Sequence, residues 1–315
     1  MRAKRAVVAI GGNSLIKDKH HQTVADQYQA MKDTTASIAD MVAAGWEVAI
    51  THGNGPQVGF ILRRSELSRH ELHEVPRDAC GADSQGAIGY ALQQTMRNHL
   101  LAKGIDRLVA TVVTQVEVSP DDPAWESPSK PIGSFMTAEM AAERKAGEGW
   151  AVVEDAGRGW RRVVSSPEPL SIVEADVVRM LLDAGVIVIT VGGGGIPVVR
   201  APDGSLKGVE AVIDKDLASA MLATVIEAGL LVITTAVEKV ALGWGTPQQR
   251  WVDRLTMAEA QAYLAEGTHF AAGSMAPKIQ ACINYLEAGG GEVLITDPEH
   301  LAAAIRGETG TRIVP

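Results

Sequence analysis

The sequence has few cysteines, few aromatic residues and no long apolar segment. Its two cysteines, Cys80 and Cys282, are too few for a disulfide framework or a zinc site, so we expect reduced thiols in or near the core. The apolar run after the basic start ends at Gly11 and is too short for a signal sequence or a membrane span, which predicts a cytoplasmic protein. Only 4% of residues are aromatic, whereas alanine, valine, isoleucine and glycine are abundant, as is typical of helices packed on short buried strands.

Positive charge is also scarce. Lysine and arginine number 29 against 38 aspartates and glutamates, and the formal net charge is −9. A protein that binds nucleic acid or an anionic membrane without regard to sequence needs a basic face, so we expect neither partner. An anionic small molecule must then be held by local groups.

Several known site motifs are missing. The chain contains no Walker sequence GxxxxGK[ST], no G-x-S-x-G nucleophile elbow and no H-E-x-x-H metal motif. The stretch "HELHE" (70–74) has the wrong spacing for a metal site and is typical of a solvated helix face. "GNGPQVG" spaces its glycines one residue away from the dinucleotide fingerprint, so a Rossmann dehydrogenase is a poor fit. We therefore predict no protein metal site.

Short apolar runs alternate with helical patterns over most of the chain. This alternation predicts a mainly parallel sheet covered by helices on both faces. The predicted strands cover residues 5–10, 47–52, 107–118, 186–191, 230–235 and 292–296. The pattern breaks from Ser119 to about Pro169, where six prolines accompany two alternating segments, "WAVVE" and "WRRVV", that predict a hairpin. We interpret 119–170 as a small inserted subdomain that protrudes from the sheet domain.

Three glycine-rich loops each follow a predicted strand. They are "GGN" at 11–13, "HGNGPQVG" at 52–59 and "GGGG" at 192–195. Open α/β sheets bind ligands at the carboxyl ends of their strands, and we expect a helix after each of the first two loops, whose free N–H groups favour an anion. One such loop is usually only a tight turn, but three at the same sheet edge predict a site for a polyanion.

Lysines supply the complementary charge. Lys215 lies between Asp214 and Asp216 at the entrance to a predicted helix, Lys278 closes "GSMAPK" at another, and Lys130 lies on the inserted subdomain. Most lysines are solvated surface residues, but the two flanking acids indicate that Lys215 is positioned. Phosphoryl transfer needs several positive groups around the moving phosphoryl group, and an anionic carboxylate acceptor needs no base. The pattern therefore favours a kinase.

The same stretches resemble the carbamate kinases of the amino acid kinase family, and the likeness runs from end to end. It is carried by "AIGGNSL", "THGNGPQVG", "SKPIGSF", "GGGGIPVV", "GVEAVIDKDLASA", "EKVALGWGTP" and "HFAAGSMAPKIQA". The resemblance implies one domain over 1–315, a three-layer αβα sandwich with a mainly parallel central sheet and a protruding subdomain. It also implies a homodimer that transfers phosphate reversibly between MgATP and carbamate, giving carbamoyl phosphate and ADP.

The resemblance further implies roles for individual residues. Lys215 and Lys278 would lie at the transferring phosphoryl group, Lys130 would arrive on a mobile subdomain, and Asp214 and Asp216 would orient the lysines. The acceptor side would occupy about 1–185 and the nucleotide side about 186–315. The residues implied for carbamate and the phosphoryl group are Gly11, Gly12, Asn13, Gly53, Asn54, Gly55, Gly193, Gly194 and Gly195. Those implied for the nucleotide are Thr234, Val237, Trp244, Met275, Ala276 and Pro277. Mg²⁺ would be held largely by nucleotide phosphates and water.

Two positions depart from the family pattern, and two other functions stay open. Ala236 stands where an aspartate often follows the threonine, and Ser134 stands where proline is common in "KPIG" loops. One alternative is a kinase for another small carboxylate or a phosphonate. The other is an inactive sensor of nucleotide or carbamoyl phosphate, which should have lost its catalytic lysines, whereas none is lost here. The sequence does not specify the direction of the reaction, nor whether arginine or purine-derived catabolism feeds it.

Overall fold

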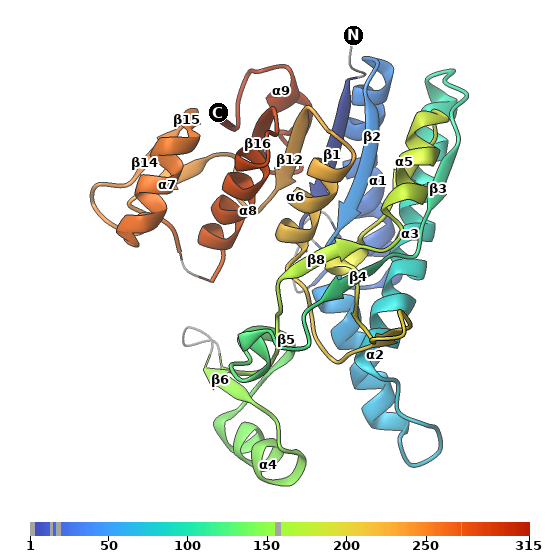
Figure 1. Cartoon of the computed structure of the whole chain (residues 1–315), viewed down its shortest axis with the longest axis vertical. Helices are drawn as coiled ribbons and strands as arrows, with labels where there is room; N and C mark the ends of the chain where they lie inside the picture. Colours follow the sequence, from blue (N-terminus) through green and yellow to red (C-terminus); the bar gives the residue numbers. More distant parts are fainter. Residues whose placement is uncertain (1–3, 13–14, 17–19, 155–158, 272) are drawn as a thin grey trace.

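An eight-stranded sheet forms the centre of the molecule in a computed structural model that describes residues 4–12, 15–16, 20–154, 159–271 and 273–315 (Figure 1). Its strands are β1 (Arg5–Ile10), β2 (Glu47–His52), β3 (Val109–Thr111), β9 (Ile187–Ile189), β12 (Leu230–Thr234), β15 (Arg254–Thr256), β16 (Glu292–Thr296) and β17 (Thr311–Val314). They lie in the order β15-β17-β16-β12-β1-β2-β9-β3, and every neighbouring pair is parallel except β16 and β17. The predicted mainly parallel sheet is confirmed.

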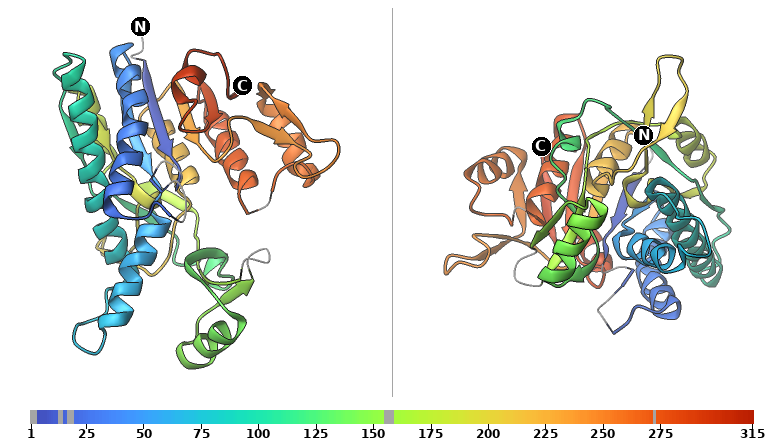
Figure 2. Two further views of the ribbon diagram at one scale, coloured as in Figure 1. Left: turned by 180° about the vertical axis from the view of Figure 1, so that it is seen from behind. Right: turned by 90° about the horizontal axis from the view of Figure 1, so that it is seen from below.

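Helices cover both faces of this sheet (Figure 2). One face carries α1 (Val24–Ala43), α3 (Arg77–Ala102) and α9 (Leu301–Ile305), and the other carries α5 (Ala175–Asp183), α6 (Lys215–Val225), α7 (Met257–Glu266) and α8 (Met275–Glu287). Side chains of β1 alternate between the two cores: Val8 and Ile10 pack on the α1 and α3 side, and Val7 and Ala9 on the α6 and α8 side. A strand buried on both faces needs apolar residues at every position, which explains the continuous run "AVVAI".

Smaller sheets connect this body to a projecting unit. Strands β4 (Gln115–Val118), β8 (Pro169–Ile172), β10 (Ile196–Arg200) and β11 (Leu206–Gly208) form a four-stranded sheet. Between β4 and β8 the chain forms η2 (Pro123–Trp125), β5 (Lys130–Met136), α4 (Ala138–Glu148), β6 (Val152–Glu154) and β7 (Trp160–Val164), and the last four project below the body in Figure 1. β6 and β7 pair antiparallel, as predicted, with Val152 opposite Arg162. β5, α4, β6 and β7 are together named the lid.

The remaining elements lie around the carboxyl edge of the central sheet. They are α2 (Gly55–Ser68), the 3-10 turn η3 (Gly192–Gly194), and the antiparallel pair β13 (Val240–Leu242) and β14 (Arg250–Val252). A helix follows each of the first two glycine loops, as predicted: among the described residues, α1 begins at Val24, and α2 begins at Gly55 within the second loop. The third loop forms η3 and is followed by the strand β10.

Two segment predictions were wrong. The run 107–118 is two strands in different sheets, because Gln85 of α3 captures the backbone between them: its Oε1 accepts from Thr114 N at 2.8 Å and its Nε2 donates to Thr114 O at 3.1 Å. "HELHE" forms an exposed turn between α2 and α3 rather than a helix face. Pro76 is the N-cap of α3, and the new helix begins only after it.

The cysteines have the predicted state. Cys80 and Cys282 are free and buried in the described structure. Burial raises the pKa of Cys80 to about 11 and raises that of Cys282 above its usual range, so both remain thiols at neutral pH. No helix of the described residues is both long enough and apolar enough to cross a bilayer.

Candidate active site

The glycine loops and the lysines surround one cavity of about 410 Å³ at the carboxyl ends of β1, β2 and β9. The glycine-loop residues that line it are Gly12, Gly53, Asn54, Gly55, Pro56, Val58, Gly193 and Gly195. The charged residues that line it are Arg77, Lys130, Asp214, Lys215, Asp216 and Lys278. Segments separated by more than two hundred positions in the sequence thus meet at the edge of the sheet where open α/β folds place their ligands.

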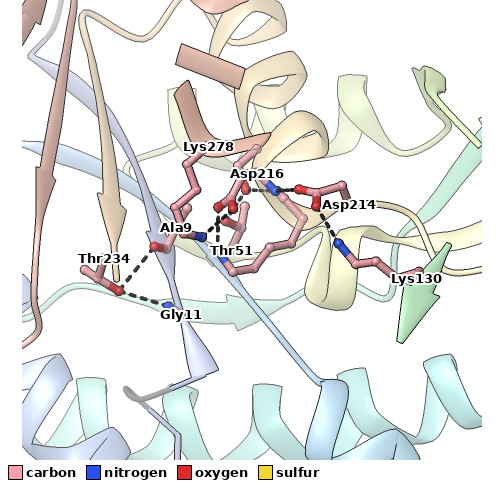
Figure 3. A network of polar contacts seen from close by, with 10 residues as sticks. Ala9, Gly11, Thr51, Lys130, Asp214, Asp216, Thr234 and Lys278 are labelled. Atoms are coloured by element: carbon pink, nitrogen blue, oxygen red, sulfur yellow. Dashed lines mark hydrogen bonds and ion pairs between the residues drawn. The ribbon is translucent and has the colours of Figure 1, made fainter. Parts of the chain in front are cut away.

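Asp216 is the anchor of the charged network (Figure 3). It lies in the first turn of α6 and is 3% exposed. Its Oδ1 accepts from Lys215 Nζ at 2.5 Å, and its Oδ2 accepts from Lys278 Nζ at 2.7 Å. Burial alone would raise the pKa of Asp216, but the two ammonium groups outweigh burial and hold this pKa well below its usual range. The carboxylate therefore stays charged and fixes both lysines in place.

The pKa values of the two lysines are shifted in opposite directions, although both lysines contact Asp216. Burial lowers the pKa of Lys215, and the neighbouring charge of Lys278 adds to the effect, although Asp216 opposes both. Burial also opposes the charge of Lys278, but there Asp216 outweighs it and the pKa is raised. One carboxylate cannot neutralise two ammonium groups, so this pair keeps a net positive charge in a buried position, which favours an anionic ligand.

Lys130 reaches the site from the lid. Its Nζ lies 2.5 Å from Asp214 Oδ2, and Asp214 Oδ1 accepts from Asp216 N at 2.8 Å (Figure 3). Asp214 is the N-cap of α6, so one carboxylate both caps the helix that carries Lys215 and receives the lysine of the lid. In the described position of the lid, Lys130 therefore lines the cavity.

The four consecutive glycines are explained by close packing against neighbouring protein atoms as well as by the cavity. Residues 193–195 have positive φ values of 69°, 93° and 93°, which favour glycine. A Cβ atom at each of the four positions would also overlap a neighbour. The nearest atoms to the added Cβ atoms are His52 Nε2 at 2.4 Å for Gly192, Asn54 Nδ2 at 2.1 Å for Gly193, Ile213 O at 2.5 Å for Gly194 and Val116 Cγ2 at 2.2 Å for Gly195. The glycine run therefore packs the loop after β2 against the segment that leads into α6.

Some predicted site residues lie behind the cavity wall. The Gly11 amide donates to Thr234 Oγ1 at 2.9 Å, and Thr234 is fully buried, so this pair fastens the end of β1 to β12 (Figure 3). Gly194 packs on Ile213 and does not line the cavity. Asn13 lies outside the described residues.

A second, apolar pocket of about 210 Å³ adjoins the first, and Ser274 lines both. Its walls are Thr235, Ala236, Val237, Ala241, Trp244, Trp251, His269, Phe270, Ala271, Ser274 and Met275. Trp244 is 50% exposed and meets Trp251 edge to face at 6.0 Å between ring centroids. Of the residues predicted for the nucleotide, Val237, Trp244 and Met275 line this pocket, Pro277 lines the first cavity, and Ala276 packs against the core. An apolar pocket beside a cationic cavity is suited to a nucleotide, whose base is apolar on its faces and whose phosphates are anionic.

Sequence analysis did not single out two residues, Arg77 in the cavity and His52 packed against Gly192. Arg77, at the start of α3, lines the first cavity and contacts Glu210 Oε2 at 3.0 Å. A lone arginine before a helix gives no signal in one sequence. His52 was visible as the first residue of the second glycine loop: it is fully buried, and burial, with Lys215 nearby, lowers its pKa to about 4 although its contact with the Gly53 carbonyl opposes this. A neutral His52 supports the loops and is unsuited to acid–base work near pH 7.

Comparisons with known proteins identify the family of the chain. The sequence model described as "Amino acid kinase family" matches residues 4–297. Over 311 residues, 98% of each chain, the sequence is 51% identical to the carbamate kinase-like protein YahI of Escherichia coli (strain K12). It is 45% identical over 314 residues to the carbamate kinase of Pyrococcus horikoshii, covering 99% of both. The solved structure of carbamate kinase from Giardia lamblia bound to AMP-PNP superposes with a TM-score of 0.91 at 39% identity, again over 99% of both chains.

Proposed function

The chain belongs to the amino acid kinase family, and from this premise we propose that it is a carbamate kinase. It transfers a phosphoryl group reversibly between ATP and carbamate, giving carbamoyl phosphate and ADP. The observation that carries the proposal is the meeting of Lys130, Lys215 and Lys278 with the glycine loops in one cavity beside an apolar pocket. In the direction of ATP synthesis, such an enzyme would serve arginine or purine-derived catabolism.

The chemistry follows from charge and placement. A carbamate oxygen forms a bond to the γ-phosphorus while the bond from that phosphorus to the oxygen of ADP breaks, and no proton has to be removed from the anionic acceptor. Negative charge spreads over the phosphoryl oxygens in the transition state. Asp216 holds Lys215 and Lys278 in position before the reaction, so their charges stabilise the transition state without reorganisation. Lys130 adds a third ammonium group from the lid.

The acceptor would bind at the N-terminus of α2. Its N-cap, Asn54, makes no capping hydrogen bond in the described structure, and its Nδ2 donates to Ser84 Oγ at 2.8 Å. Pro56 has no N–H group, so the N–H groups of Gly55 and Gln57 are the ones at this helix start that could bind an anion beside Gly53, which lines the cavity. In this arrangement 1–185 supplies the acceptor side, with 119–170 inserted to bring Lys130, and 186–315 supplies the nucleotide side.

We propose Mg²⁺ as the cofactor, held mainly by phosphate oxygens and water. Among the described residues, no cluster of three or more histidine, cysteine, aspartate or glutamate side chains could bind a metal. The carboxylates of Asp214 and Asp216 line the cavity, but lysines already occupy them. A divalent ion that brings its own phosphate ligands fits such a site, where it would neutralise phosphate charge.

A homodimer is also part of the proposal. β3 is an edge strand of the central sheet, and it lies with α3 and α5 on one side of the molecule in Figure 1. These two helices and the loops that flank β3 carry exposed apolar side chains. They are Tyr90, Leu101, Leu108, Val113, Val177 and Met180. A second copy of the chain would cover this edge and these side chains. Light scattering of the purified protein tests this expectation.

The decisive experiment incubates the purified protein with ADP, Mg²⁺ and carbamoyl phosphate and measures ATP. We expect ATP formation that depends on both substrates. The same assay with acetyl phosphate and other acyl phosphates defines the acceptor. If ATP forms from another acyl phosphate but not from carbamoyl phosphate, the protein is a kinase with an acceptor other than carbamate. Tight nucleotide binding with no transfer to any acceptor would favour a sensor.

Replacing Trp244 with alanine should raise the KM for ADP about tenfold, because stacking of a base on an aromatic ring is worth about 1–3 kcal/mol. Trp244 is half exposed in the apolar pocket, so its loss removes contact area for the base and little core packing. Initial rates at varied ADP measure the effect. Trp46, which packs beside α1 at the other end of β2, is the control: Trp46→Ala should leave the KM for ADP unchanged. An unchanged KM in Trp244→Ala would remove Trp244 from the nucleotide site.

A further inference from the structure

The lid packs mainly against helix α2. Among the described residues, the most extensive contact between the lid and the rest of the molecule is that of β5 with α2. The two elements also share the active cavity: Val58 of α2 and Ile132 of β5 both line it, and both are buried. The helix whose N-terminus faces the acceptor thus also supports the strand that carries Lys130.

The contact between the two elements centres on a pair of glycines. Gly59 lies in the second turn of α2, and Gly133 lies in β5 with a φ of 68°. A Cβ atom added at Gly59 would lie 3.2 Å from Gly133 Cα and 3.7 Å from Gly133 N. The neighbour at this point is lid backbone, which cannot rotate away as a side chain could, so extra volume at Gly59 must displace β5 or α2.

Charged and aromatic side chains surround this glycine pair. Arg144 of α4 lies 3.6 Å from Glu66 of α2, and its guanidinium also lies 5.0 Å from the ring centroid of Trp150. These residues line a pocket of about 160 Å³ between helix and lid, together with Gly59 and Gly133. The ion pair between Arg144 and Glu66 draws the lid onto α2, whereas the cation–π contact lies within the lid and helps to position Arg144. The lack of side chains at Gly59 and Gly133 sets how closely β5 can approach α2.

We propose that Gly59 is a positioning residue that sets the closed position of the lid and thereby places Lys130 in the cavity. Lys130 is three residues from Gly133 on the same strand, so a displacement of the strand at Gly133 carries over to the lysine. Glycine inside a helix is less favourable than alanine, which means that α2 would be more stable with a larger residue at position 59. The close approach of β5 explains why glycine is there. The effect on catalysis rests on the proposed function, whereas the effect on lid position does not.

The experiment compares Gly59→Ala and Gly59→Leu with the control Gly147→Ala. Gly147 lies in α4 of the lid, is exposed, and has open space where its Cβ atom would be. We expect kcat to fall a few-fold in Gly59→Ala and about 10²-fold in Gly59→Leu, as for a displacement of about 1 Å. The KM for ADP should not change, because no described residue of the lid lines the apolar pocket. The thermal midpoint of Gly59→Ala should equal or exceed that of the wild type. Gly147→Ala should match the wild-type kcat.

Two further measurements test whether displacement of the lid causes the fall of kcat in Gly59→Leu. In a Lys130→Ala background, Gly59→Leu should lower kcat no further, since both changes act through the same lysine. Amide hydrogen exchange in 130–136 should accelerate in Gly59→Leu even if the protein proves to use another acceptor. Wild-type exchange in Gly59→Leu, or a loss of kcat that adds in full to that of Lys130→Ala, would overturn the proposal.

Discussion

Replacing Lys215 with alanine should lower kcat by about 10³-fold or more, the effect typical of removing a charged group that stabilises a transition state. Lys215 lies in the cavity with its Nζ held 2.5 Å from Asp216 Oδ1, so its charge is in place before the phosphoryl group moves. The fold should survive, because Asp216 keeps Lys278 as a partner. The rate of ATP formation from ADP and carbamoyl phosphate measures the loss, and far-ultraviolet circular dichroism checks the fold.

The matched control is Lys207→Ala. Lys207 lies on β11 and is exposed, so its removal takes away one surface charge and should leave kcat unchanged. Lys215→Arg tests geometry at constant charge, and it should also be severely impaired, since a planar guanidinium cannot replace a compact ammonium group in a buried pocket. Near-normal turnover in Lys215→Ala would refute the role proposed for this residue.

Replacing Asp216 with asparagine should destabilise the protein by about 3–5 kcal/mol at pH 7, the cost typical of removing one partner from a buried ion pair. The change leaves the ammonium groups of Lys215 and Lys278 together without their shared carboxylate. The free energy of unfolding in urea measures the loss. Asp203→Asn, in the exposed turn between β10 and β11, is the control and should leave the free energy of unfolding nearly unchanged.

The difference in the free energy of unfolding between the wild type and Asp216→Asn should depend on pH. The pKa of Asp216 is depressed in the folded protein, so its contribution is complete above the ordinary carboxyl pKa and is lost as pH falls toward the folded value. The pKa of Lys215 is already lowered by burial, and without Asp216 it should fall further, so alkaline pH relieves the variant by neutralising the lysine. The gap between wild type and Asp216→Asn should therefore be widest near neutrality and shrink on both sides. A gap that widens steadily with rising pH would contradict this account.

The sheet could be predicted from the sequence because burial on both faces leaves a plain pattern. Each central strand is a continuous apolar run that ends at glycine or threonine, and each covering helix has apolar residues at helical spacing. The charged residues of the cavity were also recoverable, because Lys215 stands between two acids and the stretches around Lys130 and Lys278 resemble known motifs.

The parts that could not be predicted depend on contacts between distant segments. Gln85 splits the run 107–118 by holding the backbone of Thr114, and nothing near either residue announces this contact. Arg77 enters the cavity only because α3 begins beside it. The sequence also could not distinguish glycines that face the cavity from Gly11 and Gly194, which pack on protein atoms, because both kinds look alike in one dimension.

The tight packing of the four-glycine turn restricts how this enzyme can acquire a new acceptor. Since the turn touches His52, Asn54 and Ile213 at once, a mutation that enlarges any of its residues disturbs the floor of the pocket and the lysine helix together. Evolution or design therefore has more freedom at Arg77, which lines the cavity from the start of α3 and belongs neither to the turn nor to the lid.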